Sequence, residues 1–112
     1  MATKSRADHQ AFADALRRRV LDGPGDTDRV IRQAAAERAG GGPAIAALYE
    51  DLARQIGDSA ARVTDEQVAS VLRATGSEKA AFEIIVAAAV GAGLQRWRQG
   101  IKVLDEGTDA PA

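Results

Sequence analysis

The stretch AAFEIIVAAAVGAG, residues 80–93, holds a single charged residue, Glu83, although 28% of the residues in the chain are charged. Large apolar residues come first, and alanine and glycine follow. Gly91 and Gly93 each cost about 1 kcal/mol of helix stability relative to alanine, which indicates that another backbone approaches the helix closely. A helix that is apolar on nearly all sides is also buried on nearly all sides. In so small a domain, we expect a second subunit to cover part of this helix.

Small and apolar residues continue near heptad spacing from Phe82 to Leu104. This spacing places them along one face of a long helix. We predict that this face is an interface between subunits, formed by Phe82, Val86, Ala89, Val90, Gly93 and Trp97.

Composition excludes several classes of protein. A chain of 112 residues predicts one domain, residues 1–112. The absence of cysteine excludes disulfides, thiolate nucleophiles and Cys-ligated zinc. Fifteen basic and sixteen acidic residues leave a net charge of -1, which argues against a nucleic-acid partner.

The sequence also predicts a soluble, cytoplasmic protein. Its first ten residues, MATKSRADHQ, lack the apolar segment of a secretory signal. The apolar run of residues 80–93 is interrupted by Glu83 and is shorter than the roughly 20 residues of a membrane span. We therefore expect no membrane partner.

Helical periodicity runs through the chain and predicts an all-α fold of about five helices, the last of them long and buried. Thr64 and Gln67 form a capping box, Ser77 precedes the last helix, and Asp26 or Thr27 is expected to cap the second. The tail, residues 105–112, is expected to fray. The predicted helices span residues 5–21, 26–39, 44–56, 65–76 and 78–103.

Each of the first three helices shows an apolar face at helical spacing, which is typical of an amphipathic helix. The residues on these faces are Phe12, Ala15, Leu16 and Val20 in the first helix, Val30, Ile31, Ala34 and Ala35 in the second, and Ile45, Leu48, Leu52 and Ile56 in the third.

Two overlapping segments resemble a known family. VTDEQVASVLRATGSEKAAFEIIVAAAVGAGLQRWRQGIKVLD, residues 63–105, resembles the C-terminal region of the carboxymuconolactone decarboxylase and alkylhydroperoxidase D-like superfamily. LYEDLARQIGDSAARVTDE, residues 48–66, is similar to the helix that precedes this region in peroxidase-like members. The resemblance covers residues 44–104 and implies an alkylhydroperoxidase D-like helical array that assembles into oligomers.

Enzymes of this superfamily use an ExxCxxH motif, which this chain lacks. It has no cysteine, and its single histidine, His9, lies near the N-terminus without the glutamate of the motif. Only Glu83 and the small residues of the last helix correspond to family positions. Thiol peroxidase activity is therefore excluded, and we expect a non-catalytic subunit that binds no cofactor and associates with itself or with another superfamily member.

A second hypothesis is a cysteine-independent acid–base enzyme, or a binder, that acts on a small organic acid derived from an aromatic compound. Its candidate residues are Glu83, Tyr49, Glu50 and Arg54, with Asp51 or Arg62 as further charged groups. A catalytic Glu83 would be buried with a raised pKa. The alternatives are that Glu83 stabilises a helix N-terminus and that Tyr49 lies at the edge of the core.

A helix-turn-helix drawn over residues 63–86 would present alanine, phenylalanine, isoleucine and valine to DNA, none of which reads bases by hydrogen bonding. The acidic residues occur as adjacent pairs, at 50–51, 65–66 and 105–106. Adjacent side chains on a helix point in different directions. We therefore predict no metal site.

Overall fold

The computed structural model describes residues 5–109, and in this range the chain is all-α, as predicted, without a strand. The long helix at the C-terminal end is also confirmed. The elements in chain order are α1 (Arg6–Arg17), the π-helical turn η1 (Arg18–Asp22), α2 (Arg29–Ala39), α3 (Ala47–Ser59), the 3-10 turn η2 (Ala60–Arg62), α4 (Asp65–Thr75) and α5 (Glu78–Asp109).

Polar side chains cap the helices at their N-termini. The hydroxyl of Thr64 accepts a hydrogen bond from the backbone N–H of Gln67, so the predicted capping box of α4 is confirmed. Ser77 accepts from the N–H of Ala80 at the start of α5, also as predicted. Helix α2 is capped by Asp28, which accepts from the N–H of Val30, rather than by Asp26 or Thr27; the hydroxyl of Thr27 donates to Glu83, and the carboxylate of Asp26 pairs with Lys79.

Several helix boundaries differ from the prediction: α1 ends at Arg17, α2 begins at Arg29, and α3 ends at Ser59. Helix α3 begins at Ala47 rather than at residue 44, because Glu50 accepts a hydrogen bond from the N–H of Ile45 and holds the preceding loop out of the helix. Helix α5 continues to Asp109, so residues 105–109 are helical rather than frayed. Residues 110–112 of the predicted tail lie outside the described residues.

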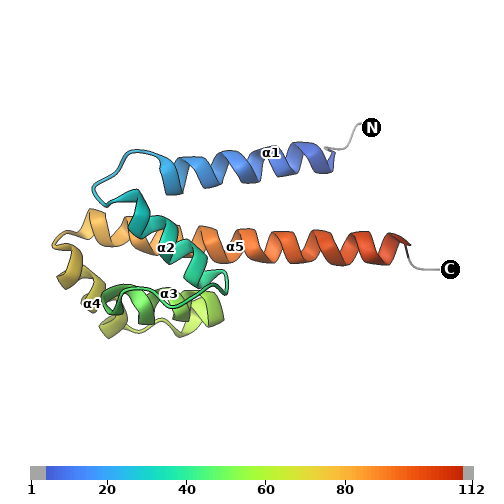
Figure 1. The fold of residues 1–112 in the computed structure, drawn as a ribbon. Helices are drawn as coiled ribbons and strands as arrows, with labels where there is room; N and C mark the ends of the chain where they lie inside the picture. The colour runs from blue at the N-terminus through green and yellow to red at the C-terminus, as the bar shows by residue number, and fades with distance from the viewer. Residues whose placement is uncertain (1–4, 110–112) are drawn as a thin grey trace.

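Helix α5 is the axis of the fold (Figure 1). Helices α2, α3 and α4 pack around its N-terminal half, and α1 runs antiparallel beside it toward its C-terminal half. The molecule is therefore elongated, with extents of 54 × 27 × 23 Å. Beyond the turn in which Arg96 donates to the carbonyl oxygen of Gly57 on α3, helix α5 extends past α2, α3 and α4, with α1 beside it (Figure 1).

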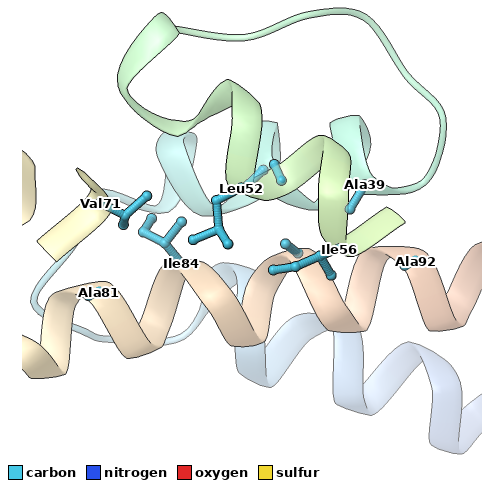
Figure 2. Close-up of a cluster of buried hydrophobic side chains, with 10 residues drawn as sticks. Ala39, Leu52, Ile56, Val71, Ala81, Ile84 and Ala92 are labelled. Carbon is cyan, nitrogen blue, oxygen red and sulfur yellow. The ribbon is translucent and has the colours of Figure 1, made fainter. Parts of the chain in front are cut away.

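The main core lies where α3 and α4 meet α5 (Figure 2). Its largest fully buried side chains are Leu52, Val71 and Ile84, one from each helix, and Ile56 packs beside them. A second cluster, Leu21 with Ala36 and Ala87, joins η1 to α2 and α5. Most of the other buried positions are alanine, so the helices pack at short distances.

Gly91 lies directly against α2 of the same chain. A Cβ atom at this position would overlap the carbonyl oxygen of Ala36, whereas a Cβ atom at Gly93 would meet nothing within 4 Å. The close backbone approach predicted from the two glycines is therefore intrachain at Gly91. The prediction that a second subunit approaches Gly91 is wrong, because α2 already occupies that side of α5.

Several residues of the predicted apolar helix faces are exposed. Val30 at the start of α2 is 64% exposed and Leu48 at the start of α3 is 58% exposed, while Arg32 is buried on α2 instead. Phe12 and Leu16 of α1 are 59% and 47% exposed, because α1 does not bury its apolar stripe against α5. The periodicity therefore identified the helices but not the residues that each of them buries.

The contrast between the two glycines is testable. We expect Gly91→Ala to lower the free energy of unfolding by roughly 1–3 kcal/mol through overpacking against α2. The matched variant Gly93→Ala has room for its methyl group and should raise the same quantity by up to about 1 kcal/mol. Urea unfolding measures both, and equal unfolding midpoints for the two variants would contradict the α2–α5 contact.

Candidate functional site

Glu83 reaches from the first turns of α5 to the loop between η1 and α2. Its carboxylate accepts hydrogen bonds from the N–H of Asp26 at 2.8 Å, from the N–H of Thr27 at 2.9 Å and from the hydroxyl of Thr27 at 2.8 Å. Lys79, one turn earlier on α5, pairs with the side chain of Asp26 at 3.1 Å. Glu83 is partly buried and fixes this loop against α5.

These contacts decide the protonation state of Glu83. Partial burial is the largest single influence and raises its pKa, but the three hydrogen bonds and the charge of Arg32 act together in the opposite direction. The net effect is a pKa below the ordinary value for glutamate. The hypothesis of a raised pKa at Glu83 is therefore wrong, because the loop donates hydrogen bonds that stabilise the ionised carboxylate.

Arg32 is a residue that the sequence analysis missed. It is 5% exposed, and its two terminal nitrogens donate to the carbonyl oxygens of Val20 at 2.8 Å and Gly23 at 2.6 Å. Its Nε atom is buried without a hydrogen-bond partner. Arg32 thus satisfies carbonyl groups at the end of η1 and brings a positive charge near Glu83. The sequence pattern that could have identified Arg32 is its position one helical turn before Ala36, on the face of α2 that otherwise carries buried alanine residues.

A hollow of about 220 Å³ lies beside this network. Val20, Phe82 and Val86 form its apolar wall, and Arg19 and Lys79 lie at its edge with Glu83. Arg32 is committed to carbonyl oxygens, and Lys79 is paired with Asp26. These two cations are therefore already engaged within the chain.

A second network surrounds Glu50 on α3. Its carboxylate accepts from Arg38 Nε at 2.9 and 3.0 Å and from the N–H of Ile45 at 3.1 Å. Arg54 lies 3.7 Å from the same carboxylate and also pairs with Asp51 and Asp58. The hydrogen bond from Arg38 is the main cause of a lowered pKa at Glu50. Glu50 therefore links α2, the following loop and α3.

The predicted catalytic candidates do not converge on one site. Glu83 binds the loop before α2, whereas Glu50 and Arg54 belong to the network at the other end of α2. Tyr49 is partly buried and packs against the main core, which matches the core-edge interpretation. Arg62 is exposed in η2. Within the described part of the chain, no three His, Asp or Glu side chains group as metal ligands would.

The predicted interface residues lie on a face of α5 that its own chain leaves largely uncovered. Phe82 is 64% exposed and Ala89 and Gly93 are exposed, while Val86, Val90 and Trp97 are partly buried. The Trp97 indole donates to Gln10 at 3.2 Å, and its ring meets His9 edge-on at 6.1 Å. We use the name α5 seam for Phe82, Val86, Ala89, Gly93, Trp97, Gly100 and Leu104.

By length and composition alone, residues 78–106 of α5 are also able to span a membrane. The apolar helix is therefore longer than the run of residues 80–93 indicated. A core helix of a water-soluble fold meets the same criterion. Helix α5 packs against α2, α3 and α4 along one side, as such a core helix does.

Comparison with known proteins finds no matching family model, no matching curated protein and no matching solved structure.

The role of Glu83 predicts a pH-dependent loss of stability. Glu83→Gln should lower the free energy of unfolding by about 1–2 kcal/mol at neutral pH, because the loop loses charge-assisted hydrogen bonds. Since the folded-state pKa is lowered, this contribution is present above the ordinary pKa of glutamate and disappears as the pH falls through the folded-state pKa. Thermal unfolding from pH 7 to pH 3 should therefore show the two proteins converging in acid. A gap that widens in acid would refute the structural role.

Proposed function

We propose that the chain is a non-catalytic helical subunit that works by association, primarily with copies of itself. The observation that supports this most is the uncovered apolar face of α5. Phe82 leaves most of its ring exposed on a helix whose other side forms the core of the fold. Exposed apolar patches of this kind mark protein–protein contacts.

The state of the carboxylates supports a non-catalytic role. General acid–base catalysis near neutral pH needs a carboxyl group whose pKa is raised toward the working pH. Both Glu83 and Glu50 have lowered pKa values, and both accept hydrogen bonds from loop backbone. Their contacts are those of groups that hold loops against helices.

The resemblance to the carboxymuconolactone decarboxylase and alkylhydroperoxidase D-like superfamily is part of this proposal and rests on residues 44–104. A chain that keeps the packing helix and lacks cysteine fits a subunit that assembles without thiol chemistry. Pairing with another superfamily member would use the same face of α5, so such a partner would compete with self-association.

Association predicts a specific mutational contrast. Phe82→Glu should convert an oligomer into a monomer, because it places a charge on the proposed interface. Val30→Glu is the matched control, since Val30 has the same 64% exposure but lies on α2, away from this face. Multi-angle light scattering during gel filtration measures both masses. A wild-type protein that elutes as a monomer at 100 µM, or equal dissociation of both variants, would count against the proposal.

A further inference from the structure

Building on the proposed self-association, we propose that two copies pair about a two-fold axis at Gly93, with their α5 helices antiparallel and their α1 helices completing a four-helix bundle. The shared face combines the α5 seam with the α1 stripe, which we define as Phe12, Leu16 and Val20. Each copy would supply the same surface to the other.

The α1 stripe and the α5 seam adjoin each other within one chain. Val20 lines the same hollow as Phe82 and Val86, at the N-terminal end of the seam. Toward the other end, Gln10 binds Trp97. Residues four apart lie on one face of an α-helix, so Phe12 and Leu16 share a face of α1, and Val20 follows them in η1.

The combined face is apolar and exposed along its length. Phe12, Leu16, Phe82 and Leu104 are 59%, 47%, 64% and 58% exposed. With 1.5 Å per residue, the seam is about 33 Å long, and two helices side by side are about 18 Å wide. The resulting footprint of about 600 Å² approaches the roughly 800 Å² that each partner contributes to a stable interface.

The order of side chains along the seam favours a second, antiparallel copy as the occupant. In an antiparallel pair centred on Gly93, each residue before Gly93 in one copy meets the residue of the other copy that lies the same number of positions after Gly93. Val86 then lies opposite Gly100, and Ala89 lies opposite Trp97. Val86 and Trp97 therefore each meet a small residue, Phe82 meets Leu104 at the two ends of the seam, and the two Gly93 residues allow the helix axes to approach. A parallel pair would set Trp97 against Trp97 and glycine against glycine, which leaves voids.

The same two-fold axis would also bring apolar residues of the two α1 helices together. Arg17 lines a hollow with Gly91 and Gln95, so its neighbour Leu16 lies close to the level of Gly93. The axis would bring Leu16 against Leu16 of the other copy and Phe12 against Val20.

The absence of native cysteine makes the geometry directly testable by oxidative cross-linking. Gly93→Cys has room for its side chain and should form a covalent dimer by itself, because the two copies meet there within the roughly 7 Å between Cα atoms that a disulfide spans. Val86→Cys and Gly100→Cys should each stay uncross-linked alone, yet form a mixed dimer when combined. Gln99→Cys, exposed but off the seam, is the control for random collision.

The outcomes separate this inference from the proposed function. A native dimer in which only Gly93→Cys and the mixed pair cross-link supports both. A native dimer in which Val86→Cys and Gly100→Cys each cross-link alone is parallel, and one in which no seam cysteine reacts uses another surface; either result overturns this inference and leaves self-association intact. A chain that is monomeric at 100 µM, and that floats with phosphatidylglycerol vesicles, assigns the face to a lipid surface and overturns both proposals.

Discussion

The contact between the backbones of α2 and α5, at Ala36 and Gly91, is the constraint on which the rest of the structure depends. It sets α2 so close to α5 that only alanine and glycine fit between them. Because α2 lies this close, Arg32 on its buried side reaches the carbonyl groups at the end of η1. The loop before α2 then comes within hydrogen-bonding distance of Glu83. One close helix contact therefore positions η1, the loop and the charged groups around it.

This arrangement explains why acidic residues in a helical core need not be catalytic. A carboxylate that accepts backbone N–H groups is stabilised in its ionised form and resists protonation. Glu83 and Glu50 do this at the two ends of α2, where the chain enters and leaves that helix.

Much of the fold follows from local patterns that the sequence carries. The capping box at Thr64 and Gln67 and the serine at 77 defined the starts of α4 and α5, because capping depends on neighbouring residues alone. The starts of α2 and α3 were set by side-chain contacts that helix-capping rules do not include. Glu83, far along the chain, accepts a hydrogen bond from the hydroxyl of Thr27, and Glu50 in the first turn of α3 accepts one from the N–H of Ile45. Arg32 likewise binds distant groups, the carbonyl oxygens of Val20 in η1 and of Gly23 directly after it.

The face of α5 was predictable for a different reason. An apolar residue such as Phe82 on a helix already buried on its other side signals a surface that the chain has not covered. The position of Gly91 was interpreted wrongly because a glycine indicates a close neighbour without indicating which chain provides it.

The central claim is that the exposed apolar face of α5 is covered by a second copy of the chain. Sedimentation velocity of the wild-type chain from 1 to 200 µM tests it most directly: we predict a mass rising to twice 11.7 kDa, and a mass that stays at 11.7 kDa throughout would contradict it.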